Sequence, residues 1–206
     1  FWVAQKFAQQ GTRVLFLCYN RQLAFWLNNK LTGLENIEII SFFSYCRQTC
    51  ERENVPFNVP VDRQAKEKFW AEDAGTYTNL ALDKASEGVK FDLVVVDEAQ
   101  DFNSDWWTTV ELSLKDLGEG QLYVFLDTHQ AGVYGHGDAY PSDGMVTQEL
   151  GVNCRNTKRI TEYNSLVLGE SISCFDRSPV GQPPVILDGN QDPAHRAQNV
   201  KKLVLN

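Results

Sequence analysis

The residues best suited to chemistry in this chain are the acids that end the run 91–101, FDLVVVDEAQD. Its apolar middle predicts a strand buried on both faces, and Asp97 and Glu98 follow at once, with Asp101 three residues later. Burying a carboxylate is costly unless it is paired or binds a metal. Two adjacent acids at such a strand end suit phosphoryl transfer, in which the first holds Mg²⁺ and the second positions or deprotonates a water. The alternative is a solvated acidic turn.

Polar side chains also follow two other apolar runs. Asn20 comes after the run 13–18, and Asp127 and Gln130 come at the end of the run 121–126. In α/β folds with a parallel sheet, the ligand site lies at the carboxyl ends of the strands. We therefore expect these side chains to converge with the two acids on one edge of a sheet.

The hydrophobic pattern predicts helices alternating with strands, which is typical of an α/β fold with a mostly parallel sheet. Gly75 is a point at which the longest helix could be interrupted, and we assign Trp106 and Trp107 to packing. Helices are expected at residues 1–10, 21–31, 63–84, around 106–110 and at 157–168, and strands at 13–18, 37–40, 92–96, 121–126, 146–152 and 183–187.

Length and composition indicate an ordinary globular protein with one main domain. No apolar run approaches the length of a membrane span and the first residues do not resemble a signal peptide, so we expect no membrane association. Five cysteines without a Cys-x-x-Cys pair favour reduced thiols and a cytoplasmic location. The net charge of -8 argues mildly against nucleic-acid binding, although a local basic or aromatic track would suffice.

Five segments occur along the chain in a fixed order: 14–21 (VLFLCYNR), 41–46 (SFFSYC), 97–101 (DEAQD), 122–130 (LYVFLDTHQ) followed by Tyr134, and 150–157 (LGVNCRNT). Together they resemble the UvrD/Rep-like superfamily 1 DNA helicases over roughly residues 1–170. The resemblance implies a P-loop NTPase of the RecA-like type, which uses ATP and Mg²⁺. Its fold is a doubly wound, mostly parallel sheet with helices on both faces.

The resemblance also implies roles for four residues at the nucleotide. Asp97 would bind Mg²⁺ on the β/γ-phosphates, and Glu98 would act as general base or orient the water. Gln130 would sense the γ-phosphate, and Arg155 would neutralise charge developing on the γ-phosphoryl group. A surface salt bridge is the alternative for Arg155.

Four further residues are candidates for contact with single-stranded DNA: Asn20, Phe43, Tyr45 and Tyr134. Aromatic rings stack on bases regardless of sequence. The alternative for Phe43 and Tyr45 is a place in the core, because alternation indicates that one of Phe42 and Phe43 points inward.

The chain departs from the family in lacking any Gly-x-x-x-x-Gly-Lys-Ser/Thr loop, which would cradle the phosphates. We expect a truncated first motor domain at residues 1–177, and at 178–206 the beginning of the second motor domain or a C-terminal extension. The isolated chain should then be inactive, whereas its parent would hydrolyse ATP in DNA repair or recombination.

Other interpretations stay open. The stretch between Cys46 and Phe91 is shorter than in the larger helicases, so a translocase, or an ATPase attached to a nuclease-related domain, is an alternative to strand separation. The chain could instead be a non-hydrolysing module, without a P-loop, that binds nucleic acid or protein. A P-loop ATPase of another class that does not act on DNA is a third interpretation.

Overall fold

The computed structural model describes residues 1–31, 33–116, 118, 120–127, 141 and 144–185. Contacts within the chain divide it into two compact units, Phe1–Met145 and Val146–Asn206. The division falls earlier than the motor-domain boundary expected after residue 177. That boundary was placed by resemblance to a family, not by compactness, and stays a prediction.

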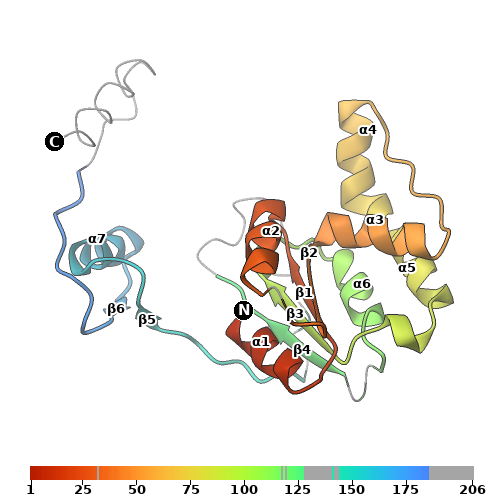
Figure 1. Cartoon of the computed structure of the whole chain (residues 1–206). Coiled ribbons are helices and arrows are strands. Elements are labelled where there is room, and N and C mark those ends of the chain that lie inside the picture. The colour runs from red at the N-terminus through yellow and green to blue at the C-terminus, as the bar shows by residue number, and fades with distance from the viewer. Residues whose placement is uncertain (32, 117, 119, 128–140, 142–143, 186–206) are drawn as a thin grey trace. The chain divides into compact units, whose positions relative to one another are not determined.

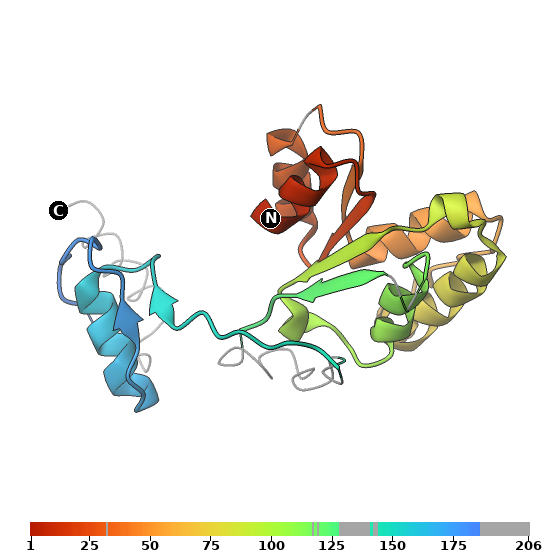
Figure 2. The same ribbon diagram turned by 90° about the horizontal axis from the view of Figure 1, so that it is seen from below.

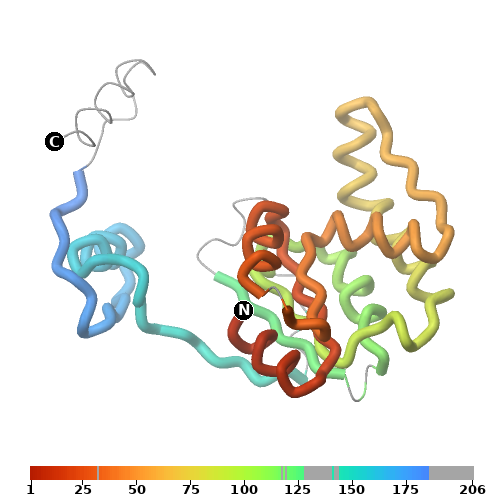
Figure 3. The backbone as a smooth tube through the Cα atoms, in the orientation of Figure 1, coloured from red at the N-terminus to blue at the C-terminus, as the bar shows by residue number. Residues whose placement is uncertain are grey.

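The first unit is built on a four-stranded sheet in the order β2-β1-β3-β4, and every pair is parallel. Its strands are β1 (Val14–Cys18), β2 (Ile37–Ser41), β3 (Leu93–Asp97) and β4 (Gln121–Val124). The course of the backbone through the crossovers between them can be followed in Figure 3. The α/β class with a parallel sheet is therefore confirmed.

Helices cover both faces of this sheet (Figures 1 and 2). On one face α1 (Trp2–Gln9) and α2 (Arg21–Lys30) pack on it. On the other face lie α3 (Phe42–Arg52) and α6 (Trp106–Leu112), and α5 (Ala74–Lys84) packs against both of these. All of β1 and the first four residues of β3 are buried, because helices cover both faces of the sheet. Since successive side chains point to opposite faces, each of these strands contributes to two separate cores.

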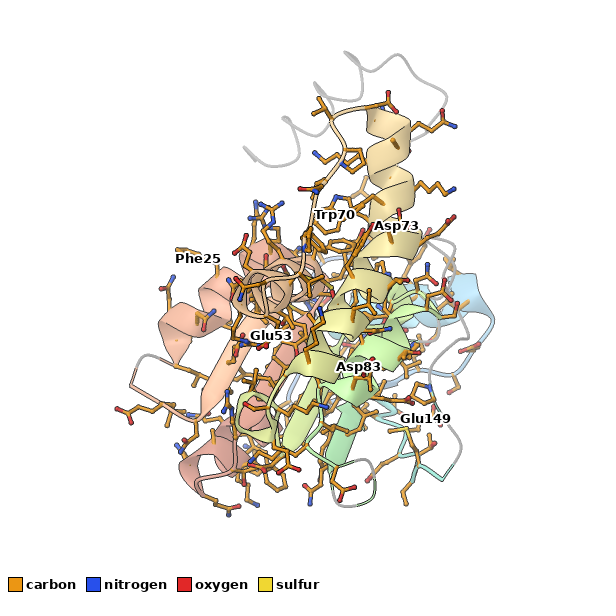
Figure 4. All side chains as sticks on the ribbon, turned by 90° about the vertical axis from the view of Figure 1, so that its right-hand side faces the viewer. Phe25, Glu53, Trp70, Asp73, Asp83 and Glu149 are labelled. Atoms are coloured by element: carbon orange, nitrogen blue, oxygen red, sulfur yellow. The ribbon has the colours of Figure 1, made fainter. Side chains whose placement is uncertain are left out.

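The helix expected at residues 63–84 is present in three parts. It begins as α4 (Arg63–Lys68), widens into a π-helical turn (Phe69–Asp73) and continues as α5. Figure 4 shows Trp70, Asp73 and Asp83 along this continuous helical column. Gly75 lies just after the π-turn, inside the regular α-helix α5. The interruption of the helix therefore comes before the glycine and not at it.

The second unit contains β5 (Val152–Asn153), α7 (Lys158–Leu168) and β6 (Ser173–Cys174), with β5 and β6 parallel. The expected helix at 157–168 is confirmed. The strand expected at 146–152 is wrong in extent, because residues 146–151 pair with no other strand among the described residues. Residues 183–185 are likewise in no strand, and 186–187 lie outside the described residues.

The cysteines form no disulfide, and Cys46 and Cys50 share the buried face of α3. Trp106 and Trp107 are buried in the core, as assigned. In the part of the chain that the structure describes, no helix has the length and apolar character needed to cross a membrane.

Candidate functional site

Asp97 is the last residue of the central strand β3 and lies opposite Cys18, the last residue of β1. Its carboxyl group is half-buried at the edge of the sheet, where the strand leaves the core. Burial raises the pKa of this carboxyl, the neighbouring Glu98 raises it further, and the amino group of Phe1 opposes both effects. A carboxylate held in this way gains from a cation, because a positive charge would offset its desolvation.

Glu98 turns the chain sharply at the end of the strand. Its backbone lies in the left-handed region, with φ 54° and ψ 46°, where residues with a side chain are uncommon. Its carbonyl accepts the N–H of Asp101 at 3.0 Å, and the next N–H, from Ala99, donates to the carbonyl of Phe125 at 2.9 Å. The turn therefore leaves the Glu98 side chain exposed, while the next residue, Ala99, is hydrogen-bonded to the residue that follows β4.

Gln100 connects this acidic turn to the end of β4, and we did not single it out from the sequence. Its Nε2 donates to Oε2 of Glu98 at 2.6 Å, and its Oε1 accepts the backbone N–H of Asp127 at 3.1 Å. The side chain is 6 % exposed. The available sequence signal was a single glutamine two residues beyond the second acid, in a string where every other polar residue is an acid.

Asn20 follows β1 at the same edge of the sheet and caps α2. Its Oδ1 accepts the N–H groups of Gln22 at 2.8 Å and Leu23 at 3.2 Å. These bonds satisfy backbone donors that have no partner inside the helix. Asn20 is exposed and so stays available for a ligand, but the structure gives it a folding role that the sequence analysis did not assign.

Phe43 and Tyr45 have different environments on α3. Phe43 is half-buried, and its ring lies 5.6 Å from that of Tyr19 and 4.8 Å from that of Trp70, centroid to centroid. Tyr45 is 1 % exposed, and its hydroxyl donates to Oγ of Ser113 at 2.8 Å. The prediction that Tyr45 contacts DNA is therefore wrong for this structure, because a fully buried ring offers no face for stacking; the alternative of a place in the core is the correct one.

The other candidates belong to the second unit or fall outside the described residues. Arg155 belongs to the second unit, where its N–H and that of Asn156 both donate to Oδ1 of Asn153 at 3.1 Å. Its side chain is exposed and forms no ion pair with any described residue, and its role stays a prediction. Gln130 and Tyr134 fall outside the described residues.

The first unit thus brings together three features that the sequence predicted at one edge: Asn20 after β1, the acids Asp97 and Glu98 at the end of β3, and Asp127 after β4. A carboxylate able to hold a cation lies beside an exposed carboxylate able to orient a water. Comparison of the sequence with protein-family models gives no match, and comparison with curated proteins gives none either.

Proposed function

We propose that this chain forms most of the first motor domain of a UvrD/Rep-like superfamily 1 DNA helicase or translocase, with the RecA-like P-loop NTPase fold of that family. The observation that carries the proposal is the position of Asp97 and Glu98 at the end of the central parallel strand, between the ends of β1 and β4. Ligands bind at this edge of open parallel sheets. The ordered sequence segments supply the choice of family.

The start of α1 supports a phosphate site beside Asp97. The positive charge of the Phe1 amino group lowers the pKa of Asp97, against the larger effect of burial, so the start of α1 lies within electrostatic range of that carboxyl. In P-loop proteins the phosphate-binding loop leads directly into a helix, whose N-terminus points at the phosphates.

The acid pair fits Mg²⁺ held jointly with a nucleotide. Among the described residues, no group of three or more His, Cys, Asp or Glu side chains could hold a metal by itself. Mg²⁺ commonly takes only one or two carboxylates and completes its shell with phosphate oxygens and water. Asp97 would be such a ligand, and the bound Mg²⁺ would neutralise charge on the β/γ-phosphates.

The remaining roles belong to the same proposal. Glu98 would orient or deprotonate the attacking water, Gln130 would sense the γ-phosphate, and Arg155 would neutralise charge on the γ-phosphoryl group. Single-stranded DNA is the proposed partner, with Asn20, Phe43 and Tyr134 as candidate contacts, and the second motor domain is the proposed intramolecular partner. We place the protein in the cytoplasm and in DNA repair or recombination.

The test is ATP hydrolysis by the native-length protein that contains this chain, with Mg²⁺, in the presence and absence of single-stranded DNA. We expect turnover stimulated by DNA and lost in Glu98→Gln, since removing a general base or water-orienting group costs about 10²–10⁴-fold. Glu51→Gln, which makes the same change on the exposed side of α3, is the matched control and should keep wild-type turnover.

A second candidate function is supported by one observation: the 206 residues contain no Gly-x-x-x-x-Gly-Lys-Ser/Thr loop. A relative that lacks this loop throughout would bind nucleic acid or protein without turnover. Hydrolysis absent from the native-length protein would favour this binding module, and hydrolysis indifferent to DNA would favour an ATPase of another class.

A further inference from the structure

We infer that Gln100 is a positioning residue that holds the Glu98 carboxylate with one end of its amide and the chain leaving β4 with the other. Its catalytic consequence rests on the proposed function, because it assumes that Glu98 acts on the attacking water. The two hydrogen bonds that Gln100 makes across the site are features of this chain and do not depend on the proposed function.

The orientation of the amide follows from the chemistry of its two partners. The carboxylate of Glu98 can only accept, so the amide nitrogen must face it, and the bond is 2.6 Å long. The backbone N–H of Asp127 can only donate, so the amide oxygen must face it, at 3.1 Å. No other uncharged side chain of this length supplies a donor and an acceptor at one planar end.

Because Gln100 is buried, the loss of either hydrogen bond would be costly. Gln100 is 6 % exposed, so an amide end left without a partner would not be compensated by bulk water. A hydrogen bond to a charged acceptor is also stronger than one between neutral groups. Glu98 itself is exposed, and its side chain would otherwise have many rotamers, so the bond from Gln100 selects one of them.

The link spans two strands that are neighbours in the sheet. Glu98 follows β3, and Asp127 lies three residues beyond the end of β4. The N–H of Ala99 already joins the turn to Phe125, so Gln100 adds a side-chain bond next to a backbone bond between the same two segments. A displacement of the chain after β4 would therefore be transmitted to the carboxylate of Glu98.

Two substitutions separate the two ends of the link. Gln100→Glu keeps an oxygen acceptor for Asp127 and replaces the amide donor with a second carboxyl, so at a pH where both carboxyls are ionised only the Glu98 end is broken. Gln100→Met keeps a similar volume and breaks both ends. Gln48→Met, on the exposed side of α3, is the matched control.

The first measurement is amide hydrogen exchange of Asp127 in this chain, together with thermal unfolding to confirm folding. We expect exchange at least about tenfold faster in Gln100→Met and near the wild-type rate in Gln100→Glu and Gln48→Met, since a lost bond of this kind is worth about one factor of ten. Equal exchange of the Asp127 amide in the wild type and Gln100→Met would overturn the link.

The second measurement is ATP turnover by the native-length protein carrying the same variants. Both Gln100 variants should lower kcat by about tenfold or more with little change in KM, and neither should lower the single-turnover rate further in a Glu98→Gln background. An additive loss in that background would show that Gln100 acts independently of Glu98. Absence of turnover in the wild type would overturn the catalytic consequence together with the proposed function, while the exchange result would still decide the link.

Discussion

The backbone of Glu98 shows how a single residue departs from ordinary preferences at the candidate site. A left-handed conformation costs a residue with a side chain about 1–2 kcal/mol, which glycine avoids. Residues keep such a strained conformation only where the surrounding structure imposes it, and they are more frequent at functional sites. At φ 54°, Glu98 keeps a carboxylate where glycine would be the less strained choice.

This strain predicts that Glu98→Gly is more stable than Glu98→Ala. Relief of strain outweighs the greater chain entropy of glycine, so we expect the free energy of unfolding to be about 0.5–1 kcal/mol higher for the glycine variant. Urea unfolding of both variants measures the difference. At Gln48, inside α3, the order should reverse, with glycine less stable than alanine by about 1 kcal/mol. Equal stability of the two Glu98 variants would mean that the conformation carries no strain.

Asn20 combines a capping role with a proposed DNA contact, and two substitutions distinguish them. Asn20→Ala removes the acceptor of two backbone N–H groups and should lower the free energy of unfolding by about 1 kcal/mol. Asn20→Asp keeps the cap but adds a negative charge, so it should weaken binding of single-stranded DNA with little loss of stability. Urea unfolding and fluorescence anisotropy with an oligothymidylate check the two effects. Unchanged DNA affinity in Asn20→Asp would remove Asn20 from the DNA contacts.

Among the elements, the π-turn at Phe69–Asp73 is the least ordinary. It divides a helical column into α4 and α5 and carries Trp70 to within 4.8 Å of the ring of Phe43 and 5.7 Å of that of Phe57, centroid to centroid. Turns of this kind are rare and are found mainly at functional sites. Here the turn completes a cluster of aromatic rings between α3 and the helical column.

Gly75 follows this turn, and the structure predicts that alanine is tolerated there. An added Cβ would lie 3.5 Å from Oγ1 of Thr109 and 3.6 Å from the carbonyl of Asp105, which is ordinary contact. Gly75→Ala should raise the free energy of unfolding by about 0.5–1 kcal/mol, because glycine costs chain entropy inside a helix. Chemical denaturation measures the change. A loss of stability would show that α5 and α6 cannot accept even a methyl group between them.

The contrasting glycine is Gly181, in the second unit. Its φ is +74°, and an added Cβ would come within 2.5 Å of the Cβ of Thr157, the residue that caps α7. Gly181→Ala should therefore lower the stability of the second unit, which makes it the control for Gly75→Ala.

For the molecule as a whole, buried acidic groups predict sensitivity to alkaline pH. Burial raises the pKa of Cys18, Tyr45 and Cys46 each to about 12. In the unfolded chain these groups ionise at about 8.5 for cysteine and 10 for tyrosine. Because the folded state holds these protons more tightly, their contribution to stability is complete below those values and is lost as pH rises toward 12.

Urea unfolding as a function of pH tests this dependence. Above about pH 9 the free energy of unfolding should fall by roughly 1.4 kcal/mol per pH unit for each group that ionises only in the unfolded state. Tyr45→Phe should reduce the slope above about pH 10, although it loses the hydroxyl bond to Ser113. A constant free energy of unfolding up to about pH 11 would contradict the burial of these groups.

The sequence by itself determined the α/β class, the four strands of the main sheet and the meeting of Asn20, Asp97 and Glu98 at one edge. These features depend on local runs of apolar residues and on the general geometry of parallel sheets, which short stretches of sequence carry. The helix at residues 63–84 was predictable for the same reason, since its pattern is local.

Only the tertiary structure decided which side chains of α3 face the core, because helical periodicity is compatible with either face until a partner is present. Tyr45 is buried in a core that it shares with residues of α6, and its hydroxyl donates to Ser113, the residue that follows α6, 68 positions away. The bridge through Gln100 and the left-handed turn at Glu98 likewise depend on β4 lying beside β3. The strand expected at 146–152 is present only as β5, at Val152–Asn153. A run of residues that favour strands becomes a strand only where another strand pairs with it, and β6 pairs with Val152 and Asn153 alone.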